Sequence, residues 1–378
     1  MAPVVHELTR RSDKFETFTL TTGQHRELLD QVLKVFDLTA DVDLEVMTPG
    51  QTLTEVTVRC LSKLEEVLPE IQPDMVLVHG DTATTLATSL ASFYQQIPIG
   101  HVESGLRTFD RYQPFPEEMN RVLTDHMCSL HFAPTPLNRD HLKRESLSGD
   151  GVFVTGNTAI DALLSVTSED YEFCNPKLQE QPWGERKLIL CDLHRRENFG
   201  QPMRNVLQGL ARLMSEYIDS YLVVSVHPNP QVSAVIREEL ESVDRTLLVE
   251  PLDYREWANL MASSHFLVTD SGGLQEEAPA LGIPVLLARE NTERPEAVTS
   301  GTVKKVGTDR SSLVSAGKQL LASGEMYESM VGTPNPYGDG RAAGRIADAL
   351  EWHWGLRSEQ PNEFKSPVQL TGESEVQL

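Results

Sequence analysis

The chain has 378 residues, which suggests two or three domains, and 39% of them are hydrophobic, which is ordinary globular usage and excludes a collagen-like or wholly disordered chain. Aspartate and glutamate number 56 against 33 lysines and arginines, giving a formal net charge of −23. This excess argues against nucleic acid and anionic membranes as main partners, because both are polyanions, although a few placed cations can still bind an anionic small molecule.

The sequence predicts neither membrane insertion nor secretion. It lacks the run of about 18 apolar residues that a membrane-spanning helix needs, and its opening MAPVVHELTRRSDKF does not have the pattern of a secretory signal. The cysteines are widely spaced, without a C-x-x-C motif, so we expect four reduced thiols in a cytoplasmic protein: Cys60, Cys128, Cys174 and Cys191.

In the first half of the chain, short apolar runs alternate with helical patterns. A helix-like segment, Ala2–Arg11, comes first. Strands are predicted at Phe15–Thr21, Met75–His79, Ile97–Val102, Leu130–Ala133 and Val152–Thr155, with helices that include Thr84–Tyr94 and Glu118–His126. This repetition indicates a parallel sheet covered by helices on both faces. Such a domain normally begins with its central strand, so the first strand and its loop are missing.

A polar stretch, Ser165–Trp183, precedes a second α/β pattern. Its predicted strands are Leu188–Cys191, Tyr221–Val226, Thr246–Val249, Phe266–Thr269 and Val285–Ala288, and its helices include Met203–Glu216 and Gln275–Leu281. We therefore expect an N-terminal domain at 1–158, a second domain at 159–335, a C-terminal helix packing back within 336–356, and a disordered tail at 357–378.

Polar clusters follow five of the predicted strands. They are Gly80-Asp81-Thr82, Glu103-Ser104-Gly105, His194–Asn198, His227–Pro230 and Asp270–Gly273. Because ligands of open α/β sheets bind at the carboxyl ends of strands, we expect these clusters to face one cleft between the domains.

Two groups of residues suggest chemistry at that cleft. Ser271-Gly272-Gly273 precedes a helix and is typical of an anion-binding turn, although a tight turn without ligand has the same pattern. Glu276 and Glu277 follow, either as ribose ligands or as a solvated helix face.

The second group comprises Asp81, Glu103 and Glu117, which suit proton transfer, with Arg121 one helical turn after Glu117. The alternative for Asp81 is a helix N-cap.

Several familiar sites are not predicted. The sequence has no G-x-x-x-x-G-K-[ST] phosphate loop and no metal-ligand spacing among its histidines, so we expect no metal. The glycines of Gly338–Gly344 imitate a dinucleotide fingerprint but do not follow a strand.

The residues resemble a known family, the non-hydrolysing UDP-N-acetylglucosamine 2-epimerases. The resemblance runs from about Ala2 to Leu350 and rests on the strings HGDTATTLA, GHVESGLRT, PFPEEMNR, TGNTAIDAL, HRREN, VHPNP, DSGGLQEEAPALGIPVL, ENTERPEA and NPYGDG. It implies two Rossmann-like doubly wound α/β domains facing a cleft, as in GT-B glycosyltransferases. It further implies a homodimer that interconverts UDP-N-acetylglucosamine and UDP-N-acetylmannosamine for cell-surface polysaccharide, by anti elimination and re-addition of UDP, without a redox cofactor.

The resemblance also assigns roles to individual residues. Asp81, Glu103 and Glu117 match the catalytic acids, and His194 matches the essential histidine. Substrate binding falls on Arg121, Leu252, Trp257, Ser271, Gly272, Gly273, Glu277 and Arg294, with Trp257 near uracil, Glu277 on the ribose and Ser271–Gly273 on the diphosphate. Leu252 stands where some members have glutamine.

A second, activating UDP-N-acetylglucosamine is bound in some members by a region corresponding to Gln24, His25, Gln51 and His227. Gly50 precedes Gln51 where regulated members carry arginine, which argues against activation.

One departure concerns the opening of the chain. The family begins with a strand and the loop G-T-R-P-E-A-I-K, whose arginine and lysine bind the diphosphate, whereas this sequence starts just after that loop. We therefore expect a sheet interrupted by one strand spacing, ~4.8 Å, and the loss of two phosphate contacts worth about 1.5–3 kcal/mol each. Either the recorded start lies within a longer reading frame, which the intact motifs favour, or the product is shortened and weak or inactive.

Three other activities remain as alternatives. A hydrolysing epimerase would release free N-acetylmannosamine, a glycosyltransferase would leave carbon 2 unchanged, and a non-catalytic homologue would only bind UDP.

Overall fold

The computed structural model describes residues 1–23, 26–48, 50–181, 184–322 and 324–368. The chain divides into two compact units, one formed by Met1–Ala162 with Tyr337–Leu378 and the other by Leu163–Pro336. Helix α7 (Thr158–Val166) runs across the first boundary. None of the helices built by the described residues has both the length and the apolar character needed to cross a membrane.

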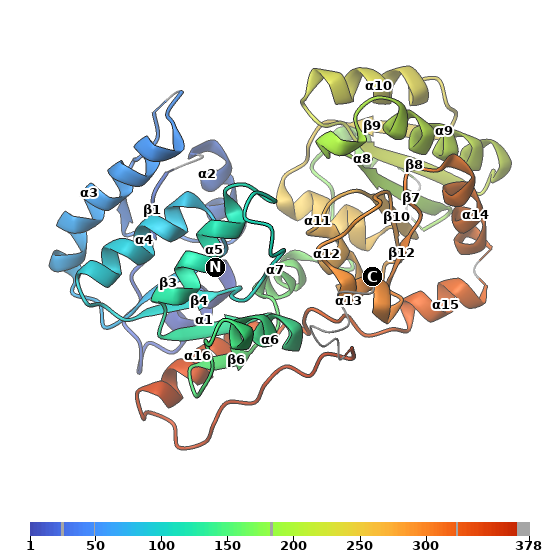
Figure 1. Ribbon diagram of the computed structural model, residues 1–378. Helices are drawn as coiled ribbons and strands as arrows, with labels where there is room; N and C mark the ends of the chain where they lie inside the picture. Colours follow the sequence, from blue (N-terminus) through green and yellow to red (C-terminus); the bar gives the residue numbers. More distant parts are fainter. Residues whose placement is uncertain (24–25, 49, 182–183, 323, 369–378) are drawn as a thin grey trace. The chain divides into compact units, whose positions relative to one another are not determined.

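The first unit alternates helices and parallel strands, as Figure 1 shows in blue to green. Its helices are α1 (Ala2–Arg10), α2 (Arg26–Val35), α3 (Leu53–Ile71), α4 (Ala83–Tyr94), α5 (Glu117–Met127), α6 (Pro136–Arg144) and α16 (Ala342–His353). Its strands are β1 (Leu20–Thr21), β2 (Val42–Asp43), β3 (Val76–His79), β4 (Ile99–Val102), β5 (Leu130–Ala133) and β6 (Val152–Val154). The predicted strand Phe15–Thr21 is reduced to its last two residues, β1.

The strands of the first unit form two sheets instead of one. Among the described residues, β1 pairs in parallel only with β2, and a separate parallel sheet has the order β3-β4-β5-β6. β3 and β6 are therefore the edge strands of the larger sheet. Leu20 of β1 and Val76 of β3 nevertheless pack against the same apolar cluster, which α3 and α4 also build, so both sheets share a core.

The opposite face of the four-stranded sheet is covered by helices from the two ends of the chain. Val4 and Leu8 of α1 and Ile346 of α16 join Phe132 and Phe153 in one buried cluster. Figure 1 shows α1 and α16 next to each other. The helix predicted at Arg341–Trp354 therefore packs back on the first unit.

The second unit contains one six-stranded parallel sheet with the order β12-β11-β10-β7-β8-β9. Its strands are β7 (Lys187–Asp192), β8 (Ser220–Ser225), β9 (Thr246–Val249), β10 (Phe266–Thr269), β11 (Val285–Leu287) and β12 (Val303–Lys305). The chain starts at β7, builds outward to β9, and returns to β10 on the other side. The strand order therefore reverses between β7 and β10, where doubly wound sheets bind their ligands.

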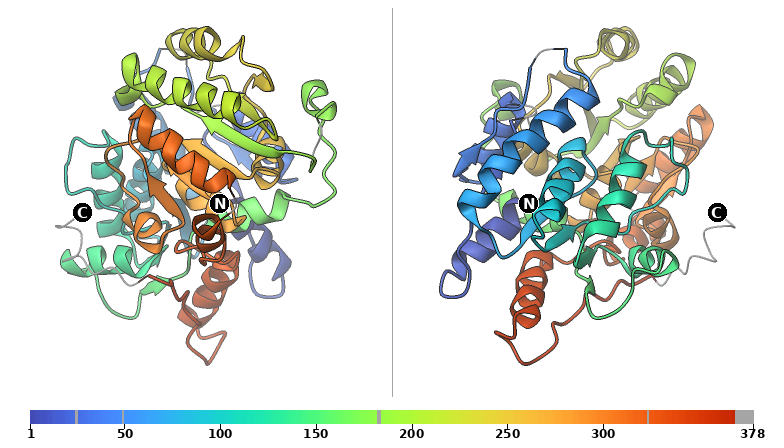
Figure 2. Two further views of the ribbon diagram at one scale, coloured as in Figure 1. Left: turned by 90° about the vertical axis from the view of Figure 1, so that its right-hand side faces the viewer. Right: turned by 60° about the vertical axis from the view of Figure 1, so that its left-hand side comes forward.

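Helices cover both faces of this sheet. They are α8 (Pro176–Gln179), the 3-10 turn η1 (Arg196–Asn198), α9 (Gln201–Glu216), α10 (Pro230–Leu240), α11 (Tyr254–Ala262), α12 (Leu274–Ala280), α13 (Pro295–Ser300), α14 (Arg310–Leu321) and α15 (Glu325–Val331). The left view of Figure 2 shows α9 in light green and α14 in orange lying side by side. Leu213 of α9 packs against Gly317 of α14, where a Cβ would lie 2.5 Å away, so glycine permits this close packing.

The segment after α16 corrects part of the expected disordered tail. Within residues 357–368, Phe364 is 6% exposed and its N–H donates to the Val154 carbonyl of edge strand β6. Glu363 accepts hydrogen bonds from the Val154 N–H and from Arg139. A single aromatic residue in a polar sequence supplies this anchor, which composition alone does not reveal. Residues 369–378 lie outside the described part of the chain.

Candidate active site

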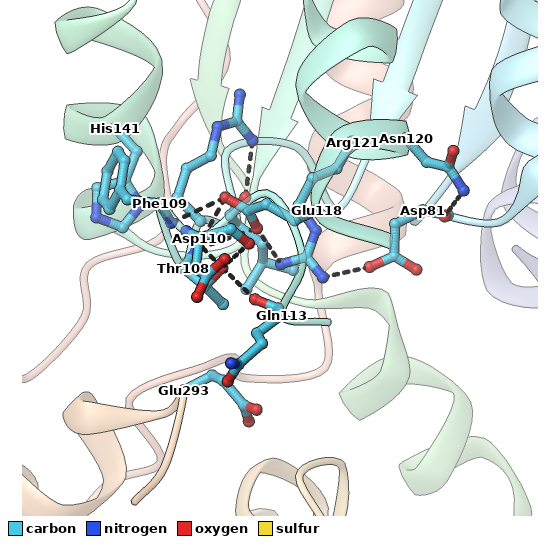
Figure 3. Close-up of polar contacts among 12 residues, drawn as sticks. Asp81, Thr108, Phe109, Asp110, Gln113, Glu118, Asn120, Arg121, His141 and Glu293 are labelled. Carbon is cyan, nitrogen blue, oxygen red and sulfur yellow. Dashed lines mark hydrogen bonds and ion pairs between the residues drawn. The ribbon is translucent and has the colours of Figure 1, made fainter. Parts of the chain in front are cut away.

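Asp81 lies in the loop between β3 and α4 and forms an ion pair with Arg121 of α5. Arg121 Nη2 donates to Asp81 Oδ2 at 2.6 Å, and Figure 3 shows its side chain pointing toward the carboxylate. Asn120 of the same helix donates to the Asp81 carbonyl at 2.8 Å. The N-cap of α4 is Thr82, whose side chain accepts from the Thr85 N–H, so the capping alternative for Asp81 is wrong.

Glu103, directly after β4, has a backbone conformation that non-glycine residues rarely adopt. Its φ is 67°, in the left-handed region, and such strain persists only where the surroundings hold it. Asn157 donates to Glu103 Oε1 at 3.2 Å, and His79 Nε2 lies 3.8 Å from Oε2. A Cβ placed on Gly80 would lie 3.3 Å from Oε2, so the carboxylate rests against the residue before Asp81.

Glu117 is the first residue of α5, and Arg121 follows one turn later on the same face of the helix. The structure therefore brings Asp81, Glu103 and Arg121 together and places Glu117 on the helix face that carries Arg121. Next to Glu117, the buried Glu118 accepts from the backbone N–H groups of Thr108 and Phe109, which Figure 3 shows together.

In the second unit, His194 follows β7 at the point where the strand order reverses. Its Nδ1 lies 3.0 Å from Asp192 Oδ2, and this hydrogen bond raises the pKa of His194 above its ordinary value. Its backbone N–H donates to the fully buried Asp270 at 3.0 Å, as does that of Arg195 at 3.1 Å. Asn198 Nδ2 also donates to Asp270, which thus fixes the whole loop.

The turn Ser271–Gly273 after β10 is flanked by two arginines. A Cβ on Gly272 would lie 3.4 Å from Arg195 Nη2 and from Arg294 Nη1, so both guanidinium groups lie directly against the turn. Arg294 Nε donates to Glu276 at 2.8 Å. The buried Nε of Arg195 has no hydrogen-bond partner within the described ranges. Two cations beside a glycine turn favour an anionic ligand over an unoccupied structural turn.

Glu276 and Glu277 are not a solvated helix face. Glu276 is 4% exposed and paired with Arg294. Burial and the nearby Glu276 raise the pKa of Glu277 to about 8, although a hydrogen bond with Tyr254 acts in the opposite direction. Burial raises the pKa of Tyr254 as well. Glu277 and Tyr254 therefore form a polar pair that can meet hydroxyl groups of a ligand.

The remaining expected residues are divided between the units. Trp257 is half-buried on α11, and Leu252 lies in the loop before that helix. His227 follows β8 and stacks on His194, with ring centroids 5.8 Å apart. Gln51 lies in the first unit, where its Oε1 accepts from the Thr48 N–H at 3.0 Å. Gln24 and His25 lie outside the described residues.

Sequence reasoning missed several residues that shape both groups. It missed Asp192, which binds His194, and it placed Arg195 and Asn198 in the polar cluster His194–Asn198 without giving either a role. Arg195 lies against Gly272, and Asn198 donates to Asp270. In the first unit it missed the buried pair His101 and Asp125. The described residues contain no group of three or more histidine, cysteine, aspartate or glutamate side chains arranged to hold a metal ion.

Comparisons with known proteins agree on one family. A family model described as UDP-N-acetylglucosamine 2-epimerase matches residues 6–351. The UDP-N-acetylglucosamine 2-epimerase of Bacillus subtilis is 48% identical over 364 residues, covering 96% of this chain and 94% of that protein.

Solved structures are also similar to this chain. A Staphylococcus aureus protein solved with UDP has a TM-score of 0.86 and 43% identity, with 97% of this chain and 96% of that chain covered. The UDP-GlcNAc 2-epimerase of Neisseria meningitidis, bound to UDP-GlcNAc, has a TM-score of 0.81 and 46% identity, with coverage of 93% and 95%.

Proposed function

Because the chain belongs to the UDP-N-acetylglucosamine 2-epimerase family, we propose that it interconverts UDP-N-acetylglucosamine and UDP-N-acetylmannosamine, for the synthesis of cell-surface polysaccharide. The observation that carries the proposal is the match over residues 6–351, and the grouping of Asp81 and Glu103 at strand ends with Arg121 of α5 agrees with it.

The chemistry of inversion at carbon 2 explains why several carboxylates are needed. The proton on carbon 2 has no adjacent carbonyl and is not acidic in the intact substrate. When the bond between carbon 1 and the UDP oxygen breaks, its electron pair leaves with UDP, carbon 1 becomes cationic and the neighbouring proton becomes acidic. A carboxylate takes that proton and a carbon 1–carbon 2 double bond forms, giving 2-acetamidoglucal.

The return step delivers a proton to the other face of carbon 2, and UDP adds back to carbon 1. Acids are therefore required on both faces of the sugar, and we assign this work jointly to Asp81, Glu103 and Glu117. Positioned proton transfer contributes about 10²–10⁴-fold, so the rest must come from stabilising the departing UDP. Oxidation state is unchanged over the cycle, so the reaction needs no redox cofactor.

Residues of the second unit are proposed to hold UDP. Arg195 and Arg294 beside Gly272 supply positive charge for the diphosphate, and His194, polarised by Asp192, supplies a proton donor. Glu277 with Tyr254 would bind the ribose, while Trp257 and the neighbouring Leu252 would contact uracil.

Product analysis by proton NMR tests this proposal. The purified chain, incubated with UDP-N-acetylglucosamine, should give UDP-N-acetylmannosamine with the nucleotide still attached, and the reverse reaction should reach the same mixture. Formation of free N-acetylmannosamine and UDP would contradict the proposal and show that the protein is a hydrolysing epimerase. An unchanged substrate would leave a UDP-binding homologue or a transferase, which titration with UDP and addition of sugar acceptors would separate.

We also propose that the protein acts as a homodimer. Large apolar side chains are exposed on three helices that pack in sequence, α3, α4 and α5, and they include Val58, Phe93, Tyr94 and Leu123. Single exposed apolar residues are common, but several on adjacent helices favour a protein interface. Light scattering should give twice the mass of the chain, and Tyr94→Glu should halve it. A monomer across the micromolar range contradicts the proposal.

A cytoplasmic location is the last part of the proposal. All four cysteines are free thiols, two of them buried, which suits a reducing compartment. Fractionation of cells that produce the protein should recover it with cytoplasmic markers, and recovery with an extracellular or envelope fraction would contradict this location.

A further inference from the structure

Helix α5 holds the loops around the acids through a row of buried polar side chains. Glu118 binds the backbone of Thr108 and Phe109, and Asn120 binds the carbonyl of Asp81. Asp125, two turns further along, is fully buried. A fully buried charge lowers the stability of the fold unless it is paired and hydrogen-bonded. The partners of Asp125 therefore indicate its role.

Asp125 connects strand β4 and the loop that follows it to α5. Its Oδ1 lies 2.6 Å from His101 Nδ1 on β4, and its Oδ2 accepts from the Gly105 N–H at 3.2 Å. The guanidinium of Arg107, whose side chain is fully buried, lies 2.8 Å from Oδ2 and also pairs with Glu145. The positive charges of His101 and Arg107 thus balance the negative charges of Asp125 and Glu145, which offsets the cost of burying the cluster.

His101 carries the connection on to Asp81. Its second ring nitrogen, Nε2, lies 2.8 Å from the carbonyl oxygen of Gly80, the residue before Asp81. A carbonyl oxygen can only accept, and the carboxylate of Asp125 also accepts, so both ring nitrogens must carry protons. His101 is therefore a buried imidazolium. In agreement, Asp125 raises the pKa of His101 against the effect of burial, while His101 and Arg107 bring the pKa of Asp125 to about 2.

The segments held in this way enclose the strained residue Glu103. Gly105 has a φ of 82°, and a Cβ there would lie 2.3 Å from the Asn138 carbonyl oxygen, so the loop follows one narrow path. The Gly105 N–H binds Asp125, and the Gly80 carbonyl binds His101, on the two loops that carry Glu103 and Asp81. Contacts on both sides of Glu103 in the chain, at His101 and Gly105, therefore help to hold its left-handed φ.

We propose that Asp125 and His101 are positioning residues, a buried ion pair that fixes the loops of Asp81 and Glu103 relative to α5, the helix that carries Glu117 and Arg121. The pair touches none of the reacting atoms and acts by setting the distances among the acids. This inference rests on the proposed function for its catalytic consequence, while the positioning itself is a property of the unliganded fold.

Steady-state kinetics of Asp125→Asn provide the first test. Loss of the charge should lower kcat by about 10²-fold, the cost of misplacing catalytic groups by about 1 Å, while KM and the affinity for UDP stay within about threefold. His101→Gln, which keeps a donor but loses the charge, should have a smaller effect of the same kind. If Asp125→Asn keeps kcat within twofold of the parent protein, the proposal is wrong.

Glu351→Gln serves as the matched control. Glu351 is a buried carboxylate in the same unit, it accepts from Arg11 and Lys14 at 2.7 and 2.8 Å, and it joins α1 to α16 away from the acids. This variant should lose thermal stability to a similar extent but keep its kcat. If it loses as much kcat as Asp125→Asn, the effect is general destabilisation, and positioning by Asp125 is refuted.

Two measurements without turnover separate this inference from the proposed function. Amide hydrogen exchange should rise in residues 80–81 and 103–107 of Asp125→Asn and stay low there in Glu351→Gln; equal exchange in both variants overturns the positioning role. Nitrogen-15 NMR should show His101 doubly protonated at pH 7, and a neutral ring would contradict the ion pair. If the parent protein shows no epimerase activity but gives both expected results, the proposed function is refuted and the positioning role is not.

The protonation result must be interpreted with the other groups that face His101. Asp125 on α5 and Glu103 after β4 favour its charged form, whereas His79 on β3 and His131 on β5 carry competing positive charge when protonated. Burial lowers the pKa of both of these histidines, so they are neutral where His101 is charged.

Discussion

Arg121 Nη2 and Asp81 Oδ2 lie 2.6 Å apart although 40 residues separate them in the sequence. The side chains are 10% and 29% exposed, so the pair is partly shielded from water but not isolated. A guanidinium presents its donors in one plane, and it therefore fixes the direction of the carboxylate as well as its charge. The proposed proton transfer depends on that direction.

Arg121→Lys tests this dependence. Lysine keeps the charge but not the planar donors, so kcat should fall by about tenfold, while Arg121→Gln, which leaves Asp81 without a cation, should cost about 10²-fold. Arg139→Lys is the control, because Arg139 pairs with Glu363 at 2.7 Å outside the acid group and should retain full activity. Equal kcat in Arg121→Lys and the parent protein would show that the pair is only structural.

Gly272→Ala should weaken UDP binding. The added methyl group would lie 3.4 Å from Arg195 and Arg294, in van der Waals contact with both, and would cover part of the turn that we propose to face the diphosphate, so the dissociation constant measured by calorimetry should rise by about tenfold. Gly344→Ala, whose Cβ meets nothing within 4 Å, is the matched control and should bind UDP normally. Unchanged affinity for UDP in Gly272→Ala would contradict the assignment of the two arginines to the diphosphate site.

UDP binding should also be linked to protons through Glu277. The pKa of its carboxyl group is raised to about 8, so it is protonated at pH 7 without ligand, whereas accepting two ribose hydroxyls favours the carboxylate. Affinity should therefore increase from pH 6 to pH 8.5, with proton release visible by calorimetry in buffers of different ionisation enthalpy. Glu277→Gln should bind more weakly and without proton release; proton release that persists in this variant assigns the linkage elsewhere.

The same group affects stability with a definite sign. Between its unfolded pKa near 4.5 and the raised folded pKa of about 8, the folded protein holds more protons than the unfolded chain, so stability from this group falls as pH rises through that window. The thermal midpoint of Glu277→Gln should decline less between pH 5 and pH 8 than that of the parent protein.

Asp192→Asn should shift the pH dependence of turnover. The hydrogen bond from His194 to Asp192 raises the pKa of the imidazole, and its charged form would stabilise departing UDP, so kcat should decrease as pH rises through that pKa. Without the carboxylate the decrease should begin at lower pH. Asp244→Asn, an exposed residue of the same unit, should leave the profile unchanged. Superimposable profiles for Asp192→Asn and the parent protein would rule out His194 as the titrating group.

Phe364→Ala tests the ordered part of the C-terminal segment. Phe364 is buried beside strand β6, and its truncation should reduce stability by about 3–5 kcal/mol, measured by denaturant unfolding followed in the first unit. Leu356→Ala removes a side chain that is 53% exposed and should cost little. Equal midpoints for the two variants would show that the segment adds no stability.

Much of the fold follows from local patterns. All five strands predicted for the second unit are present, because continuous apolar runs such as Phe266–Thr269 belong to fully buried parallel strands. The three residues of β12, Val-Lys-Lys, escaped prediction because an edge strand needs only one buried side chain. In the first unit, only Leu20 and Thr21 of the predicted strand Phe15–Thr21 pair with another strand, β2.

The site could be predicted only where a chemically suitable residue lies at the carboxyl end of a predicted strand. Asp81, Glu103 and His194 come within two residues of the ends of strands, so their place at the sheet edge can be predicted from the sequence. Asp125 could not be predicted in this way, because it lies inside a helix and its role follows from hydrogen bonds with His101 and Gly105, more than 19 residues earlier. Arg195 stands within the predicted cluster, but only the fold shows that its guanidinium reaches Gly272.

Deuterium uptake at carbon 2 tests the central claim most directly. When the reaction runs in D₂O, every molecule of UDP-N-acetylmannosamine should carry deuterium at that carbon, and the remaining UDP-N-acetylglucosamine should gain it as the mixture equilibrates. Product that forms with its original carbon 2 proton retained would contradict elimination and re-addition through exchangeable acids.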